Sequence, residues 1–308
     1  MNKKINILFC CNEEYAQHMT VCLVSILKNS EASSFNVVVV GKFENKNILD
    51  KVNKSLAIFN NYELQIKEFD FKLMNSYPIR CHYSLDIYTR LWVQRFFSEE
   101  VEKVVYLDSD MIVTGDITEL WNIDIGNNVL GAVPIPWYKQ THLPNFELKY
   151  GFFNSGLLVF NLKEWSRQNC EKKVLQFIID NADILHNPDQ DALNDCFYKQ
   201  YMPLPYEWNL IRPYYQPSVD PSVLKSLKIE DIKAILTREK IIHYNGSSKP
   251  WHYMDNHIRK NIYYEYLKYT QWRHFIPEDR TINNIVKKTL SKILPKKIKI
   301  FIKNLFNV

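Results

Sequence analysis

The sequence predicts an α/β fold with an open, mostly parallel central sheet and helices on both of its faces. Two observations favour this class: apolar runs of strand length alternate with amphipathic helical segments at the start of the chain, and buried-strand runs recur later. A hydrophobic content of 46% with 24% charged residues is typical of a globular protein. No stretch reaches the about eighteen consecutive apolar residues of a membrane-spanning helix.

The N-terminal part alternates strands with helices. Its first apolar run is short and stops at polar residues beginning with Asn12, so we interpret it as a strand and not as a signal peptide. The predicted elements are strands at 5–11, 35–40 and 62–69, and helices at 16–28 and 47–59. This order predicts a parallel sheet of the nucleotide-binding kind.

The rest of the chain adds strands with longer connections. A helix that Ser84 can cap is expected to end near residue 97. The elements predicted after it are strands at 104–107, 129–133, 152–162 and 240–242, a turn and short helix at 115–121, and helices at 163–181 and from 188. Prolines and aromatic residues dominate 201–221, which indicates an ordered irregular segment.

Glycine-rich phosphate loops are missing from the sequence. The chain has seven glycines, and it contains neither a G-x-G-x-x-G motif nor a P-loop. A bound nucleotide would need another way to neutralise its phosphates. A divalent cation held by carboxylates would provide one.

Two carboxylates directly follow one of the predicted strands. The run from Val104 to Leu107 suits a strand covered on both faces, and Asp108 and Asp110 come at its carboxyl end, where open parallel sheets bind their ligands. Spaced two residues apart, both side chains can reach one hard cation such as Mg²⁺ or Mn²⁺. The alternative is a simple turn, because Asp-Ser-Asp is also ordinary loop chemistry.

Three further groups follow the last predicted strand: His243, Gly246 and Lys249. A metal held by two carboxylates accepts a neutral histidine as a third ligand, and Lys249 can pair with a diphosphate oxygen. The alternative for His243 is a histidine in a surface loop.

Asp189, Gln190 and Asp191 lie at the start of a predicted helix, and Arg90 lies on the helix that precedes the Asp108 strand. First-turn carboxylates can simply complement the helix dipole, and for Asp191 this explanation weighs as much as a catalytic role. Arg90 has an equally simple alternative as part of a solvated helix face.

The net charge of +5 is concentrated at the C-terminal end. Residues 281–308 hold seven lysines and no acid, so the preceding part is near neutral and we expect no nucleic-acid partner. Apolar residues recur there at helical spacing on both sides of Pro295, with lysines opposite them. This pattern is typical of helices that lie on an anionic membrane. The alternative is a helix pair docked on the body or in an oligomer.

Six motifs, taken in order, resemble those of glycosyltransferase family 8, which includes retaining galactosyl- and glucosyltransferases of bacterial surface glycans and the glycogenins. They are NEEYA (12–16), YTRL (88–91), YLDSD (106–110), FNSG (153–156), NPDQD (187–191) and HYNGSSKPW (243–251). The resemblance covers about residues 5–275. It is specific for the family and much less specific for the sugar.

The resemblance implies a GT-A type, Rossmann-like catalytic domain, which we expect over residues 1–280. The tail, residues 281–308, is expected to associate with a membrane because of its own apolar and basic pattern. The donor would be UDP-galactose or UDP-glucose, and the acceptor a glycan or glycolipid of the lipopolysaccharide or capsule kind. Mn²⁺, or Mg²⁺, would bind Asp108, Asp110 and His243. The positions that match donor contacts in the family are Gly246 and Lys249 for the diphosphate, and Arg90, Asn154, Ser155, Gly156, Asp189 and Gln190 around the sugar.

Asn12 and Glu14 fall where family members contact uracil and ribose. Those two positions are commonly Asp and Asn in the family, so the chain departs from the pattern at both. Because a uracil N–H can donate to the Asn12 side-chain oxygen as well as to a carboxylate, we still expect UDP.

The implied reaction retains the α configuration. A retaining glycosidase would need two carboxylates about 5 Å apart, but the residue expected beneath the anomeric carbon matches Gln190, a poor nucleophile. We therefore expect a front-face substitution in which the leaving phosphate oxygen takes the acceptor proton, with Arg90 and Asp189 also at the reacting centre. The alternative is Asp191 as a covalent nucleophile.

Two other functions remain open from the sequence: a non-catalytic nucleotide-sugar-binding scaffold of the same fold, and a two-metal nucleotidyltransferase. The six cysteines form no C-x-x-C pair, which favours reduced thiols in a cytoplasm. The expected location is therefore cytoplasmic, with peripheral attachment to the inner face of the cytoplasmic membrane.

Overall fold

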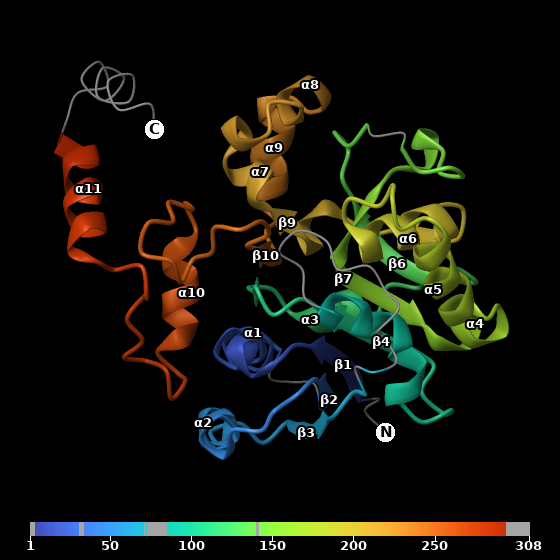
Figure 1. Ribbon diagram of the computed structural model, residues 1–308, viewed down its shortest axis with the longest axis horizontal. Helices are drawn as coiled ribbons and strands as arrows, with labels where there is room; N and C mark the ends of the chain where they lie inside the picture. The colour runs from blue at the N-terminus through green and yellow to red at the C-terminus, as the bar shows by residue number, and fades with distance from the viewer. Residues whose placement is uncertain (1–3, 31–33, 71, 73–84, 140–141, 294–308) are drawn as a thin grey trace.

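A seven-stranded sheet forms the centre of the protein (Figure 1). The computed structural model describes residues 4–30, 34–70, 72, 85–139 and 142–293. The strands of the sheet, in spatial order, are β3 (Tyr62–Lys67), β2 (Phe35–Val40), β1 (Ile5–Cys10), β4 (Lys103–Leu107), β7 (Phe153–Asn161), β6 (Leu130–Pro134) and β8 (Tyr201–Pro203). Among the described strands of this sheet, β7 alone runs antiparallel to its neighbours, so the predicted mostly parallel sheet is confirmed.

Helices cover both faces of this sheet, as predicted. One face packs against α1 (Ala16–Asn29) and α2 (Lys46–Leu56), and the other against the 3-10 helix η3 (Leu85–Phe96), α5 (Cys170–Asp180) and α6 (Pro188–Phe197). Along β4, Val105 and Leu107 enter the first core and Val104 and Tyr106 the second. Burial on both sides explains why this strand is a continuous apolar run.

The remaining helices are short or lie toward the C-terminal end. They are η1 (Glu13–Tyr15), α3 (Ile117–Trp121), α4 (Leu162–Arg167), η4 (Leu148–Tyr150), η5 (Tyr206–Trp208), α7 (Arg212–Tyr215), η6 (Pro217–Val219), α8 (Val223–Ser226), α9 (Ile229–Leu236), α10 (Lys260–Leu267) and α11 (Ile282–Ile293). Among the described residues, none of the helices has both the length and the apolar character needed to cross a membrane.

Two helix predictions need correction. The helix expected over 163–181 is two helices, α4 and α5, because the chain breaks at Asn169, whose φ of 51° is a left-handed conformation that asparagine tolerates. The helix expected before residue 97 is of the 3-10 type and is kinked at Trp92. Its expected cap, Ser84, lies outside the described residues.

A second, three-stranded sheet was not predicted, and it matters for function. Its strands, in spatial order, are β5 (Met111–Val113), β10 (Ile241–His243) and β9 (Leu210–Ile211). His243, expected after the last strand, is in fact its final residue and pairs with Met111. The pairing brings His243 beside the segment that carries Asp110.

Candidate active site

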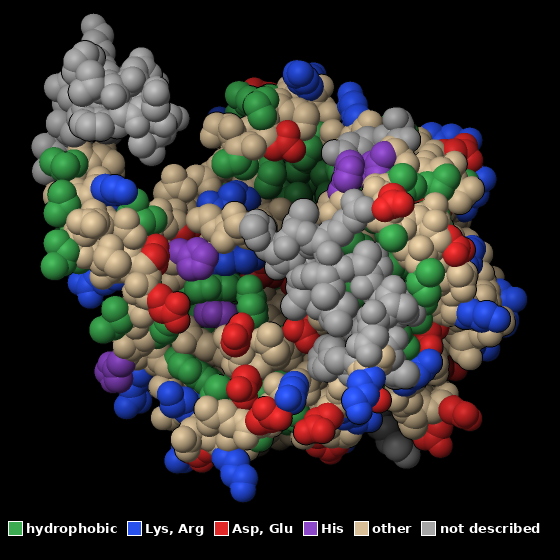
Figure 2. All heavy atoms as spheres, viewed as in Figure 1, with side chains coloured by type: hydrophobic (Ala, Val, Ile, Leu, Met, Phe, Trp, Pro, Cys, Tyr) green, Lys and Arg blue, Asp and Glu red, His purple; other side chains and the backbone are tan. Residues whose placement is uncertain are grey.

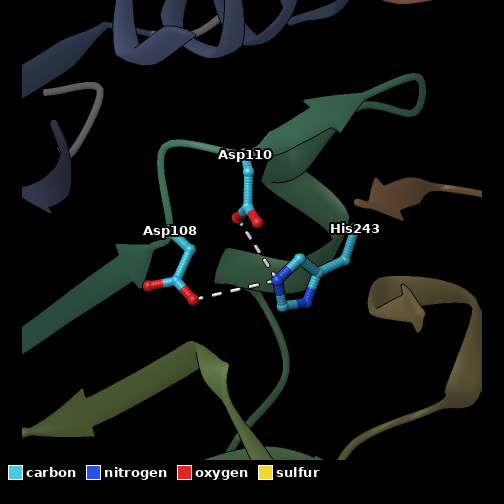
Figure 3. A group of neighbouring side chains, drawn as sticks. All are labelled: Asp108, Asp110 and His243. Carbon is cyan, nitrogen blue, oxygen red and sulfur yellow. Dashed lines mark ion pairs between the residues drawn. The ribbon is translucent and has the colours of Figure 1, made fainter. Parts of the chain in front are cut away.

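Asp108, Asp110 and His243 point toward one another at the junction of the two sheets (Figure 3). Asp108 follows β4, where its backbone N–H donates to the carbonyl of Gly156 (2.8 Å), and the Tyr244 N–H donates to the carbonyl of Asp110 (3.0 Å). His243 Nε2 lies 3.3 Å from Asp110 Oδ1 and 3.8 Å from Asp108 Oδ2. One potential ligand atom from each residue lies within 4.8 Å of the other two.

The hydrogen bond at Nδ1 of His243 leaves Nε2 as the ring nitrogen that can bind a cation. Asn209 uses its side-chain N–H to donate to Asn154 Oδ1 (2.9 Å), so its oxygen faces His243 Nδ1 at 2.9 Å and accepts the proton there. In the neutral imidazole, Nε2, which faces the two carboxylates, is therefore the nitrogen that carries the lone pair. A buried polar partner that fixes the tautomer in this way is typical of metal-binding histidines. Nothing in the sequence patterns indicated Asn209.

Gly156 gives the cluster its space. A Cβ at this position would lie 2.4 Å from His243 Cε1 and 2.7 Å from Asp108 Oδ2, so any side chain would displace both groups. Gly156 thus supports the site by having no side chain. The donor set of two carboxylates and one imidazole nitrogen, open to this small space, fits a divalent cation such as Mn²⁺ or Mg²⁺.

Arg90 is a buried part of the site and not a solvated helix face, since it is only 6% exposed. Its guanidinium lies 3.1 Å from Asp108 and 3.5 Å from Asp189, and it donates to the carbonyl of Ser155 (2.9 Å). Burial alone would lower the pKa of Arg90, but Asp108, Tyr106 and Asp189 raise it above its usual value. The guanidinium therefore stays charged and ties the cluster to the residues of α6.

Lys249 supplies a second cation. Its ammonium group forms an ion pair with Asp110 and donates to the carbonyl of Tyr244 (3.0 Å). Burial raises the pKa of Asp110, but Lys249 and His243 outweigh it and hold that pKa well below its usual range. Gly246, in the same loop, has a φ of 87° and is exposed, with no atom within 4 Å of where a Cβ would be.

The Lys249 loop is fixed by an aromatic stack that the sequence patterns did not reveal. His18 of α1 stacks on Trp251 with ring centroids 3.5 Å apart, and its Nδ1 lies 2.8 Å from the Tyr263 hydroxyl. Burial is the main reason that the pKa of His18 is lowered to about 3. The imidazole is therefore neutral near pH 7 and acts as a packing group.

Asp189 and Gln190 adjoin the FNSG segment of β7. The Ser155 hydroxyl donates to Asp189 (3.1 Å), and Gln190 Oε1 accepts from the Asn154 side chain (2.9 Å) and the Ser155 N–H (3.1 Å). Burial raises the pKa of Asp189, and the charge of Arg90 partly offsets this effect. The structure thus brings together the side chains expected around the donor sugar.

Asp191 has other partners, at the start of α6. Its side chain is fully buried, and Oδ2 accepts from the backbone N–H groups of His186 (2.7 Å) and Asn187 (2.9 Å). His142 Nε2 lies 3.2 Å from the same oxygen, a neighbour that the sequence did not indicate. These contacts stabilise the start of α6.

Asn12 and Glu14 lie at the end of β1. The Asn12 oxygen accepts from the N–H groups of Glu14 (3.1 Å) and Tyr15 (3.4 Å), and its side-chain N–H donates to Asp86 (3.3 Å). Glu14 is exposed. Among the described residues, neither side chain hydrogen-bonds to Asp108, Asp110 or His243, so Asn12 and Glu14 form a separate end of the site.

Comparison with known proteins gives one consistent result. A family model described as Glycosyl transferase family 8 matches residues 6–255. General stress protein A of Bacillus subtilis is 28% identical over 87% of this chain and 94% of its own. A lipopolysaccharide 1,2-glucosyltransferase of Escherichia coli K12 is 24% identical over 89% and 81%. A crystal structure of the galactosyltransferase LgtC with donor and acceptor sugar analogs has a TM-score of 0.77 at 22% identity and covers 89% of this chain and 98% of LgtC. The last similarity establishes the GT-A type of fold.

Proposed function

The chain belongs to glycosyltransferase family 8, and we propose that it is a metal-dependent, retaining α-glycosyltransferase that moves galactose or glucose from a UDP-sugar to a glycan acceptor. One observation supports this proposal above all: Asp108, Asp110 and His243 converge from two sheets on one space, with Arg90 and Lys249 beside it. Paired carboxylates and cations of this kind suit a diphosphate bridged to a cation.

A divalent cation, Mn²⁺ or Mg²⁺, held by the three side chains would stabilise the charge that develops on the leaving diphosphate. Unit charges about 4 Å apart interact by about 4 kcal/mol at an effective dielectric constant of 20. Lys249 would share its ammonium between Asp110 and a phosphate oxygen, and the Gly246 backbone would line the same loop. His243 keeps its Nε2 lone pair available because Asn209 accepts the proton on Nδ1.

The sugar would lie against Asn154, Ser155, Asp189 and Gln190. Two hydrogen bonds to the Gln190 oxygen fix the orientation of its amide. Unlike a carboxylate, this amide carries no negative charge. An uncharged amide at the position expected beneath the anomeric carbon supports front-face substitution, with the acceptor proton passing to the leaving phosphate oxygen. Asp189, held by Arg90 and Ser155, would position the sugar hydroxyls.

Asp191 is proposed to position α6 and not to act as a nucleophile. Its side chain is fully buried, and one carboxylate oxygen, Oδ2, accepts from two backbone N–H groups. A nucleophile would need an oxygen directed at the anomeric carbon. The burial of Asp191 therefore supports the front-face route.

The acceptor is proposed to be a lipopolysaccharide or another surface glycan, because relatives include a lipopolysaccharide glucosyltransferase. The sugar can be galactose or glucose, since LgtC is a galactosyltransferase. Residues 1–280 would form the catalytic domain.

Residues 281–308 are proposed to attach the enzyme to the anionic inner face of the cytoplasmic membrane. In α11, Ile282 is 81% exposed, Val286 50% and Leu290 47%. Figure 2 shows hydrophobic side chains along the outer edge of this helix. Exposed apolar groups alternating with lysines suit the boundary between lipid headgroups and acyl chains. The part of the predicted pattern that follows Pro295 lies outside the described residues.

The test is to incubate the purified protein with Mn²⁺ and a panel of UDP-sugars and to follow UDP release by slow hydrolysis. Release with UDP-galactose or UDP-glucose is expected, and NMR of the product of transfer should show an α linkage. Tight binding of a UDP-sugar without any release or transfer would overturn the proposal in favour of a non-catalytic scaffold.

A further inference from the structure

One residue, Arg212, holds the Lys249 loop (245–249) near both of its ends. The loop is exposed over 246–248, so these residues have little packing of their own. The backbone N–H of Arg212 donates to Asn245 Oδ1 (2.8 Å), and the Arg212 guanidinium donates to the carbonyl of Ser248 (2.9 Å). The first residue of α7 therefore determines how the loop lies on the body.

Arg212 is itself held by a buried ion pair with Asp255. The two side chains are 11% and 0% exposed, and the Ser248 hydroxyl donates to the same Asp255 oxygen (2.8 Å). Burial raises the pKa of Asp255, but hydrogen bonds to the carboxylate, that of the His257 N–H first, outweigh burial and keep this pKa below its usual value. The carboxylate is therefore charged beside the guanidinium, and it adds a further contact to the loop.

This ion pair suits positioning better than stabilisation. Buried ion pairs add little net stability, because desolvation offsets most of the attraction between the charges. A planar guanidinium, however, has its donors in fixed directions. The Arg212 donors also reach Gln216 Oε1 (3.1 Å), so the guanidinium bonds to three different groups. Since α7 follows β9, which pairs with the strand that ends at His243, Arg212 links the loop to that strand (Figure 1).

We propose that Arg212 and Asp255 are positioning residues, which hold the Lys249 loop in the shape that presents the Lys249 ammonium group to the donor diphosphate. The inference rests on the proposed function and deepens it, because it assigns to the diphosphate subsite two residues that the sequence patterns did not indicate. Neither side chain is expected to touch the donor. A loop freed from the pair would hold Lys249 in several orientations, and ordering it again on binding would cost affinity.

The test is the Kd of inorganic diphosphate, measured by titration calorimetry with saturating Mn²⁺, in the wild type and in Arg212→Lys. Lysine keeps a positive charge for Asp255 but lacks the planar fork, so it cannot hold Ser248 as well. The Kd should rise at least about tenfold, because hydrogen bonds from a charged group are lost and the loop loosens. Arg259→Gln is the matched control and should keep the Kd: Arg259 also pairs with a carboxylate, that of Glu239, but among the described residues its side chain has no hydrogen bond to the loop.

A double-mutant cycle with Lys249→Gln separates positioning from a general loss of structure. If the ion pair acts through Lys249, adding Arg212→Lys to Lys249→Gln should raise the Kd by less than about twofold. A general disturbance of the site would instead weaken diphosphate binding by the same factor in both backgrounds. Equal factors, or an unchanged Kd in Arg212→Lys, would overturn the inference.

Should circular dichroism show that Arg212→Lys does not fold, Ser248→Ala decides. This exposed change removes only the side-chain hydrogen bond to Asp255, and the Kd should still rise at least about threefold. An unchanged Kd in Ser248→Ala would then overturn the inference. A wild type that binds no diphosphate with Mn²⁺ would instead overturn the proposed function.

Discussion

The candidate metal site, formed by Asp108, Asp110 and His243, and helix α11 are built in opposite ways. Asp108, Asp110 and His243 come from distant parts of the chain, and their side chains are 26%, 11% and 3% exposed. In α11, by contrast, apolar side chains are exposed, and the helix is tied to the body by polar contacts such as Lys288 with the carbonyl of Tyr253. A site made of mutually dependent polar contacts fails when one group changes. Binding by a surface of repeated apolar and basic residues weakens gradually as single residues are replaced.

The largest effect is expected for Asp108→Asn, which removes one charge from the proposed metal site. A loss of about 4 kcal/mol in stabilising the leaving diphosphate corresponds to about a thousandfold in kcat. Turnover of the UDP-sugar is the measurement, with circular dichroism to check the fold and Asp50→Asn as the control. A folded Asp108→Asn protein with near-normal kcat would refute the assignment.

Deletion of residues 281–308 should have the next largest effect. We expect it to reduce membrane binding and to leave turnover nearly unchanged. Each lysine near an anionic surface contributes about 1 kcal/mol, so partition onto anionic vesicles should fall at least about a hundredfold. Turnover with a soluble acceptor should stay within about twofold, because none of the described side chains of α11 contacts the site residues. Unchanged sedimentation with vesicles would show that the tail packs elsewhere.

Asp191→Asn should have a modest effect on catalysis. The amide oxygen can still accept from the His186 and Asn187 N–H groups, so kcat should fall by less than about tenfold while the midpoint of thermal unfolding drops. Loss of all turnover, or a glycosyl adduct on Asp191 found by mass spectrometry, would favour the covalent route.

The smallest effect concerns His18, at the border between the site and the C-terminal segment. Its pKa is about 3 in the folded protein, against 6.5 ordinarily, so the unfolded chain binds an extra proton between these values. Stability should therefore be complete above about pH 6.5 and fall by up to about 1.4 kcal/mol per pH unit as the pH drops toward 3. Urea unfolding at several pH values should show a shallower decline for His18→Phe, which retains the stack on Trp251. Equal slopes would contradict a neutral, buried His18.

The sequence predicted the parts of the molecule with strong local patterns. The strand at 35–40 has the predicted bounds, and Asp108 and Asp110 lie at a strand end as expected, because continuous apolar runs and charged stops are visible in one dimension. The second sheet was missed because strands of two or three residues carry no periodicity. Asn209 and His142 were missed for a related reason: their roles come only from partners far along the chain.

The most direct test is a Mn²⁺ titration in the presence of UDP, followed by the electron paramagnetic resonance signal of free Mn²⁺. The wild type and the form lacking residues 281–308 should each bind one Mn²⁺ per chain, whereas Asp108→Asn should bind it at least about a hundredfold more weakly. Equal Mn²⁺ affinity in Asp108→Asn and the wild type would contradict a metal centre at Asp108, Asp110 and His243.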